Sequence, residues 1–458
     1  MYRCVAKVAA GRAGVRRKSL PSSREAGPAG APASDLSGHY PSYTEQGTVK
    51  RVVIVGGGGA GDAAAFALRK KGFDGEVVII SADLNRPYDR PYLSKEFLRG
   101  EVELPKVFLH GEDDYSKEKI ELRLNQRVVG GSLADRSLQV EGKGGGKVSF
   151  DILVLGLGGT PRWLPGVPHS ENVLTLRSLR DSQSLRKALN DSSRILLIGA
   201  GFIGAEVGAS ARQMDKEVLI VEPGPVPLSR ALGAEVGKIY ASIHRAKGVD
   251  VRTGTTVEKW HTKGENVAGV TLSDGRREEV DMVVLAVGID PNLEIPKALG
   301  LPIEGGGVSV DEGLRAADGV YCGGDIAFHP HPVLGKGIRV EHWEVAKNQG
   351  RAIGASIVSG NTPYTRLPYF WSDQYDISLE YRGHASGDDR AVWRGDREEL
   401  AFSVFYLRDR LIKAVLSMND KKSNEAGGKL IESRRPIDEK ALADPSVDLS
   451  ELIPATAS

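Results

Sequence analysis

The sequence predicts an α/β protein with a small α+β module at its C-terminal end. Two short apolar strands, 52–55 and 195–198, each lead into a glycine-rich turn and then a helix. Strands and helices alternate through most of the chain, as they do where helices cover a parallel sheet. Near the C-terminal end, three β-rich segments (391–394, 400–407 and 411–418) indicate an antiparallel sheet followed by a helix. We therefore expect two Rossmann-like dinucleotide-binding domains and one smaller domain.

The first glycine-rich turn has the spacing of a dinucleotide-binding loop, with Gly56, Gly58 and Gly61 directly after the strand 52–55. Gly58 would let the backbone approach a pyrophosphate, and Gly61 would let helix and strand pack closely. Asp83 follows the next strand, about 20 residues after the last glycine, where an acid accepts hydrogen bonds from a ribose. The alternative for Asp83 is an ordinary turn residue.

The second glycine-rich turn repeats this arrangement in full, with the loop and helix start at Gly199, Gly201, Ile203 and Gly204. Glu222 ends the following strand, again about 20 residues after the last glycine. A carboxylate at this position accepts from the 2′-hydroxyl of an adenosine ribose and repels a 2′-phosphate, and no arginine follows it directly. The second site is therefore predicted to bind NADH rather than NADPH. Two dinucleotide sites in one chain indicate electron transfer between their ligands.

Composition excludes several other classes of protein. The chain has 458 residues, so it is expected to contain several domains. Its net charge of +1 provides no overall attraction to nucleic acid, and no apolar run is long enough to span a membrane. The two cysteines, Cys4 and Cys322, form no Cys-x-x-Cys motif, which excludes a redox-active disulfide of that type and an iron–sulfur centre within the chain.

Residues 1–24 contain seven basic residues and no acid, and residues 21–47 are rich in Pro, Gly, Ala and Ser. One interpretation is an organelle transit peptide, which would place the protein in mitochondria. The other is a disordered tail or an early start site, with the protein in the cytoplasm, and this is the interpretation we favour.

Several further segments resemble a known family. The run 86–95, Arg-Pro-Tyr-Asp-Arg-Pro-Tyr-Leu-Ser-Lys, is similar to a signature of the flavin-dependent ferredoxin reductases that serve oxygenases and cytochromes P450. The segments 319–325, 339–343 and 370–373 resemble the second flavin motif and the flavin-flanking aromatic segments of that family, in the same order. The segment 281–292, which includes Gly288, resembles the strand that returns from the nicotinamide domain. Apoptosis-inducing factor and monodehydroascorbate reductases have related patterns.

The resemblance implies FAD in the first site and NADH in the second. It implies that Asp83 holds the adenosine ribose of FAD and that Asp325 holds its ribityl or pyrophosphate end. It also implies that Lys95 pairs with Glu206 beside the flavin, in the first turn of the nicotinamide-domain helix; the alternative for Glu206 is a simple helix-terminal acid. The other residues implied near FAD are Arg90, Gly158, Glu341, His342, Trp343 and Trp371, of which Trp371 has a buried core tryptophan as its alternative.

One departure from the family pattern is visible, because Leu157 replaces the threonine of an Ala-Thr-Gly turn while Gly158 is kept. His329 and His331 are separated by Pro330, so we expect a loop with divergent side chains and no metal site. The expected domains are a tail at 1–47, a discontinuous FAD domain at 48–165 and 298–365, an NAD domain at 166–297, and an interface domain at 366–458.

The predicted activity is that of an FAD-dependent NADH reductase. The resemblance implies hydride transfer from NADH to FAD and then single-electron transfer to a ferredoxin or Rieske-type iron–sulfur protein. The alternatives are reduction of a small acceptor such as monodehydroascorbate, a quinone or oxygen, or a redox-sensing module like apoptosis-inducing factor. Basic residues for docking an acidic ferredoxin are expected among Arg315, Lys336 and Arg339. A monomer or homodimer is expected.

Overall fold

The computed structural model describes residues 49–453, so the predictions made for residues 1–47 lie outside the described part of the chain. The described residues belong to one compact unit. None of the helices between residues 49 and 453 has the length and apolar character that a membrane span requires.

The first sheet holds the first glycine loop. Its six strands have the order β20-β21-β7-β1-β2-β3, and β1 pairs in parallel with both β2 and β7. Residues 320–322 of β21 pair in parallel with residues 153–155 of β7, so strands from both sides of the second glycine loop share this sheet. This pairing supports our proposal of a discontinuous domain at 48–165 and 298–365. The strand bounds are β1 Arg51–Val55, β2 Glu76–Ile80, β3 Ile120–Arg123, β7 Ile152–Leu155, β20 Arg315–Ala317 and β21 Val320–Cys322.

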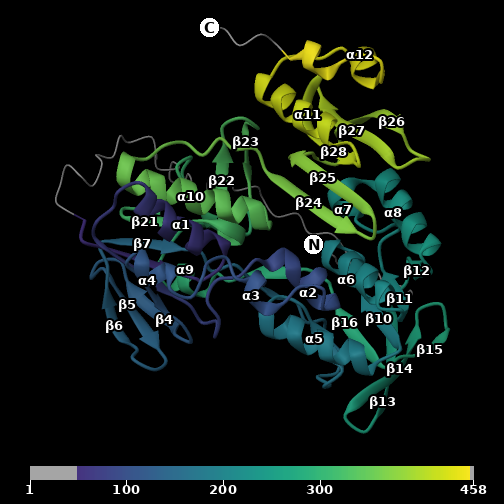
Figure 1. Ribbon diagram of the computed structural model, residues 1–458, viewed down its shortest axis with the longest axis horizontal. Helices are drawn as coiled ribbons and strands as arrows, with labels where there is room; N and C mark the ends of the chain where they lie inside the picture. Colours follow the sequence, from purple (N-terminus) through teal and green to yellow (C-terminus); the bar gives the residue numbers. More distant parts are fainter. Residues whose placement is uncertain (1–48, 454–458) are drawn as a thin grey trace, which may run out of the picture. The chain divides into compact units, whose positions relative to one another are not determined.

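Two helices meet very closely over this sheet, α1 (Gly59–Lys70) and α10 (Trp343–Ser359), which lie side by side in Figure 1. Glycines on α10 permit the approach, because a Cβ atom on Gly350 would lie 2.1 Å from the carbonyl oxygen of Ala60. Any larger residue would force the helices apart. The contact places the N-terminus of α10 next to the glycine loop that begins α1.

The second sheet holds the second glycine loop and is parallel throughout, as expected for a Rossmann-like domain. Its strand order is β12-β11-β10-β16-β9, and β10 pairs with both β11 and β16. The helix α6 (Phe202–Gln213) follows β10 directly. The bounds of the strands are β9 Val173–Thr175, β10 Arg194–Ile198, β11 Glu217–Glu222, β12 Asp250–Thr253 and β16 Met282–Leu285.

The C-terminal module is a five-stranded antiparallel sheet followed by α11 (Lys421–Ser433), drawn in green to yellow in Figure 1. The strand order is β24-β25-β28-β27-β26. The three β-rich segments seen in the sequence form β26 to β28, and β24 and β25 precede them. The bounds are β24 Tyr369–Gln374, β25 Ile377–Gly383, β26 Arg390–Asp396, β27 Ala401–Arg408 and β28 Leu411–Met418.

One expectation was wrong, because His329 and His331 do not lie in a loop with divergent side chains. Both belong to β22 (Ala327–His331), each is 1% exposed, and their ring centroids are 5.6 Å apart. Alternation along a strand places residues i and i+2 on one face, and pairing with β23 (Lys336–Ile338) fixes that strand despite Pro330. Within residues 49–453, no group of three His, Cys, Asp or Glu side chains has the arrangement of a metal site.

Burial of His329 makes stability depend on pH. Desolvation lowers the pKa of His329 to about 4, from 6.5 in the unfolded chain. Between these values the unfolded state binds a proton that the folded state does not, so the free energy of unfolding falls as the pH is lowered through this window. We expect His329→Leu to remove up to about 1.4 kcal/mol of that loss per pH unit. Urea unfolding of both holoenzymes at neutral pH and near pH 5 measures this difference. An equal fall in the free energy of unfolding in the unchanged protein and in His329→Leu would show that His329 is not its cause.

Candidate functional site

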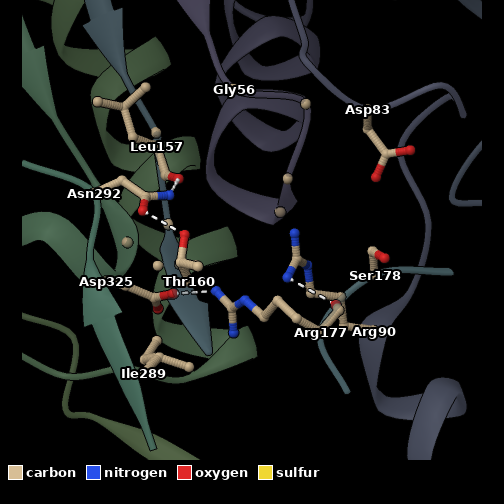
Figure 2. Close-up of a pocket in the computed structure, with 18 of the residues that line it drawn as sticks. Gly56, Asp83, Arg90, Leu157, Thr160, Arg177, Ser178, Ile289, Asn292 and Asp325 are labelled. Atoms are coloured by element: carbon tan, nitrogen blue, oxygen red, sulfur yellow. Dashed lines mark hydrogen bonds and ion pairs between the residues drawn. The ribbon is translucent and has the colours of Figure 1, made fainter. Parts of the chain in front are cut away.

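A cavity of about 1140 Å³ is lined by residues of both glycine loops. The first loop contributes residues 56–60 and the second contributes residues 201–203. Figure 2 shows part of the lining, with Gly56 and Asp83 on one side and Asn292 and Asp325 on the other. The two predicted nucleotide sites therefore open into one continuous space.

Both loops leave helix N-termini free to bind a ligand. Gly58 precedes α1 and Gly201 precedes α6, and neither helix has a side-chain cap on its first N–H groups. Such N–H groups and the helix dipole favour an anion. A Cβ atom on Gly61 would lie 2.0 Å from the carbonyl oxygen of Gly56, whereas one on Gly58 would meet only Arg90, at 4.0 Å. Gly61 is thus required by the chain itself, and Gly58 leaves space on the cavity side.

Two arginines provide positive charge beside the first loop. Arg90 donates to the carbonyl oxygen of Arg177, and the Arg177 guanidinium pairs with Asp325 (Figure 2). Burial and the charge of Arg177 lower the pKa of Arg90. The Nε of Arg177 is buried without a hydrogen-bond partner among the described residues. Two adjacent cations and an unsatisfied buried donor beside the cavity fit a bound diphosphate.

Arg177 was missed by the sequence analysis. It lies just past the end of β9, after Leu176, and precedes Ser178, which caps the helix α5 (Leu179–Asp191) through a capping box with Asp181. That capping box was a detectable signal for a helix start, and the residue before it lies at the carboxyl end of a parallel strand, where ligands bind in such sheets. No glycine motif accompanies it.

The two acids predicted to bind ribose differ in their surroundings. Asp83 lines the cavity, accepts from the hydroxyl of Tyr88 at 2.7 Å, and accepts from the backbone N–H of Asn85 at 2.9 Å. Glu222 does not line the cavity, and its two carboxylate oxygens accept from the backbone N–H groups of Ala200 and Gly224, each at 2.8 Å. Glu222 therefore holds the backbone of the second glycine loop in place, and its negative charge lies beside that loop.

Lys95 and Glu206 form a buried ion pair at the meeting point of the two loops. The Lys95 Nζ lies 2.8 Å from the Glu206 Oε2, and the side chains are 8% and 6% exposed. Ser94 also donates to Oε2 at 2.5 Å, and Ser372 of β24 donates to Oε1 at 2.8 Å. Three donors converge on this carboxylate, which compensates for its loss of water.

The position of Glu206 on its helix differs from the expectation. The helix α6 begins at Phe202, so Glu206 lies in the second turn, and the first turn of α6 contains no acid. The helix dipole acts mainly within the first turn. Glu206 is therefore stabilised by Lys95 and the two serine hydroxyls rather than by the helix terminus.

The aromatic residues surround the same part of the cavity. Trp343 begins α10 and its ring lies against Gly59, where a Cβ atom would be 2.8 Å from the indole. His342 lies between Phe370 and Trp371, with ring centroids at 4.9 and 6.0 Å. Burial and the charge of Lys95 lower the pKa of His342 to about 3, so the imidazole is neutral. Trp371 lines the cavity and is partly exposed, which does not fit its alternative as a fully buried core residue.

Most of the predicted site residues line the cavity. Those that do so are Gly56, Gly58, Asp83, Arg90, Lys95, Gly158, Gly201, Ile203, Glu206, Gly288, Asp325, Glu341, His342, Trp343 and Trp371. Gly61, Gly199, Gly204 and Glu222 lie behind the lining and shape the loops. Besides Arg177, the sequence analysis missed the cavity-lining residues Ser178, Arg180, Ile289 and Asn292.

The Leu157 departure has a structural consequence. The side-chain amide of Asn292 donates to the carbonyl oxygen of Leu157, and its oxygen accepts from Thr160 (Figure 2). The turn is therefore fixed by Asn292 without a hydroxyl at position 157. Gly158 has a φ of +62°, which favours glycine.

The residues present fit FAD and NADH. The open space at Gly58, the free Nε of Arg177 and the uncapped N-terminus of α1 suit the pyrophosphate of a flavin dinucleotide. The uncapped N-terminus of α6 suits a second dinucleotide, and Glu222 gives the second loop a negative charge. In the described part of the chain the single cysteine, Cys322, is buried, and burial raises the pKa of its thiol, so it does not supply a reactive thiolate.

Comparison with known proteins agrees with this site. Residues 50–350 match the pyridine nucleotide-disulphide oxidoreductase family, and residues 369–453 match the reductase C-terminal family. Putidaredoxin reductase CamA of Pseudomonas putida is 34% identical over 412 residues, which cover 88% of this chain and 97% of that protein. The ferredoxin reductase subunit of a 5,5′-dehydrodivanillate O-demethylase from Sphingobium is 35% identical, with 88% and 98% covered.

Solved structures give the same result. The covalent putidaredoxin reductase–putidaredoxin complex matches with a TM-score of 0.84 at 32% identity, covering 88% of this chain and 98% of that one. The ferredoxin reductase of the CYP199A2 system from Rhodopseudomonas palustris also has a TM-score of 0.84 at 32% identity, with 88% and 100% covered. The chain belongs to the pyridine nucleotide-disulphide oxidoreductase family, as a flavin-dependent oxidoreductase of the ferredoxin reductase type that uses FAD and NADH.

Proposed function

We propose that this protein is an NADH-dependent ferredoxin reductase that supplies electrons to an oxygenase through a small ferredoxin or Rieske-type iron–sulfur protein. The observation that supports it most directly is the single cavity lined by both glycine loops, with the Lys95–Glu206 pair where they meet. FAD held there would supply the chemistry that links two-electron hydride donation by NADH to single-electron release. The proposed compartment is the cytoplasm, where NADH is available, and the proposed assembly is a monomer or homodimer.

The chain's own residues bind and align the cofactors. Arg90, Arg177 and Asp83 line the cavity, where the two arginines would neutralise the diphosphate of FAD and Asp83 would accept from its ribose. Lys95 holds positive charge beside the flavin, where negative charge develops on reduction, and Glu206 keeps the ammonium in place. Trp343 and Trp371 line the cavity and would position the flavin ring system through the large contact area of their indoles. Neutral His342 adds no charge.

The acceptor is proposed from the relatives, among which putidaredoxin reductase has a solved complex with putidaredoxin. The three basic residues expected to dock a ferredoxin all have internal partners. Arg315 pairs with Asp311, Arg339 pairs with Glu341 and donates to the carbonyl oxygen of Asp325, and Lys336 donates to the carbonyl oxygen of His384. Their role in docking therefore stays a prediction.

An anaerobic experiment tests this function. NADH is added until the flavin absorbance bleaches, and the rate of reoxidation is then recorded with a plant-type ferredoxin, a Rieske ferredoxin and monodehydroascorbate. Fast reoxidation by an iron–sulfur protein is expected. Fast reoxidation by monodehydroascorbate alone would replace the proposed acceptor with a small molecule, and a long-lived reduced complex with NAD would indicate a redox-sensing module.

Choice of nucleotide tests Glu222. Glu222→Gln removes the negative charge and keeps one of the two oxygens that accept from the backbone N–H groups of Ala200 and Gly224. We expect the KM for NADPH to fall at least about tenfold, because the negative charge that repels a 2′-phosphate beside the loop is removed, while the KM for NADH rises only slightly. Steady-state kinetics with both nucleotides measure the ratio. An unchanged ratio would mean that another residue discriminates against the 2′-phosphate.

A further inference from the structure

A chain of buried hydrogen bonds leads away from Glu206 on the side opposite Lys95. The Ser372 hydroxyl donates to the Glu206 Oε1 at 2.8 Å, and the Gln374 Nε2 donates to the Ser372 Oγ at 3.1 Å. The Gln374 Oε1 lies 2.9 Å from the His244 Nε2, and the Tyr375 hydroxyl lies 3.0 Å from the His244 Nδ1. Ser372, Gln374 and His244 are 0%, 2% and 1% exposed, so water does not compete for these bonds.

The chemistry of the groups fixes the direction of every bond. The Glu206 carboxylate, paired with Lys95, only accepts hydrogen bonds, so the single hydroxyl proton of Ser372 points to it. The Ser372 oxygen must then accept, which requires the NH₂ of Gln374 on that side. The amide oxygen of Gln374 consequently faces His244, whose Nε2 must bear the proton, and the Nδ1 accepts from Tyr375. Burial lowers the pKa of His244 to about 4, which keeps its imidazole neutral.

The chain also joins two modules. Glu206 is on α6 and His244 is on α8 (Ala234–Ala246), both in the proposed NAD domain, whereas Ser372 and Gln374 are on β24 of the C-terminal sheet. β24 also carries Trp371, which lines the cavity. A single polar connection therefore ties the orientation of the buried pair to the strand that borders the flavin site.

We propose that Gln374 and His244 are positioning residues for hydride transfer, which direct the Ser372 hydroxyl to Glu206 and so hold the Lys95–Glu206 pair in one orientation. This inference rests on the proposed function for its kinetic consequence. In every hydrogen bond of the chain, the donor is the group farther from the Glu206 carboxylate. Hydrogen bonds aligned in this way polarise one another in a buried environment. The buried pair at the cavity is thus held by residues that do not themselves line the cavity.

Gln374→Glu tests the direction of the chain with little change in shape. A carboxylate at position 374 only accepts hydrogen bonds. The single Ser372 proton can then bond to either carboxylate, so the Glu206 Oε1 no longer has the Ser372 hydroxyl to itself. We expect the limiting rate of flavin reduction at saturating NADH to fall about tenfold, the effect of losing one hydrogen bond to a charged group. Ser372→Ala should cause a similar loss, and the double variant should lose about tenfold rather than about a hundredfold, because both changes remove the same bond.

A readout independent of turnover comes from His244. In ¹⁵N-histidine-labelled holoenzyme at neutral pH, its signal should show the neutral Nε2–H tautomer, identified by its disappearance in His244→Gln. In Gln374→Glu the imidazole should become protonated beside the new carboxylate. A neutral Nδ1–H tautomer in the unchanged protein would overturn the inference.

The matched control is Asn424→Asp. Asn424 is 0% exposed on α11 of the same module, and its Oδ1 accepts from Arg382 rather than from any member of the chain. The Asn424→Asp substitution introduces an acid that is as buried as the one in Gln374→Glu, and it is expected to leave the rate of flavin reduction unchanged. Should Gln374→Glu fail to fold, the tautomer of His244 in the unchanged protein still tests the direction of the chain. Additive losses would overturn the inference, whereas absence of bleaching in the unchanged protein would contradict the proposed function and leave the tautomer result standing.

Discussion

Replacing Lys95 by methionine is expected to slow the reduction of bound FAD by NADH about 100-fold, the effect of removing one preorganised donor from the place where charge develops. Lys95 lies where both glycine loops border the cavity, and its ammonium is 2.8 Å from Glu206. Methionine keeps the length of the side chain but removes the charge that stabilises a reducing flavin. Anaerobic stopped-flow absorbance at saturating NADH measures the rate.

The same substitution should also destabilise the fold, because it leaves the Glu206 carboxylate buried without its cation. Such an uncompensated charge costs about 3–5 kcal/mol. Adding Glu206→Gln should restore most of the stability, since an amide is uncharged and the Ser94 and Ser372 hydroxyls remain within reach. It should not restore the rate. Recovery of both quantities in the double variant would show that the pair has only a structural role.

Two substitutions in the first glycine loop should distinguish a glycine required for FAD binding from one required for the stability of the fold. Gly58→Ala is expected to fold, because Gly58 has a φ of −88° and its Cβ position lies no closer than 4.0 Å to a neighbouring atom. That Cβ would occupy the space proposed for the FAD pyrophosphate, so FAD affinity should fall at least about 100-fold, or about 3 kcal/mol. Flavin content after purification and FAD titration of the apoprotein measure the loss.

Gly61→Ala should behave differently. Its Cβ would lie 2.0 Å from the carbonyl oxygen of Gly56, inside contact distance, so the loop and the start of α1 must move. We expect a lower melting temperature even without FAD, in contrast to Gly58→Ala. Gly201→Ala in the second loop is a control for FAD retention, since its Cβ would be 4.0 Å from the nearest atom and it borders the NADH side. Equal melting temperatures for the Gly58 and Gly61 variants would contradict this division.

The parallel strands, the glycine loops and the acids after them were predictable because each depends on residues close together in the chain. An apolar strand followed by Gly56, Gly58 and Gly61 specifies a turn and a helix start through backbone conformation alone. The β-rich segments after residue 390 likewise reveal their strands by local preference. The Lys95–Glu206 pair was predicted only through resemblance to a family, because no local rule connects those positions.

The tertiary structure decided which distant polar groups meet. Arg177 reaches Asp325 because β9 ends beside the cavity, and no motif distinguishes that arginine from others in the sequence. His329 and His331 are buried because pairing with β23 makes their segment a strand. The chain from Glu206 through Ser372 and Gln374 to His244 exists because α6, α8 and β24 pack together. Sequence patterns report backbone preferences over a few residues, whereas buried polar groups find their partners only when packing excludes water and leaves one arrangement that satisfies all of them.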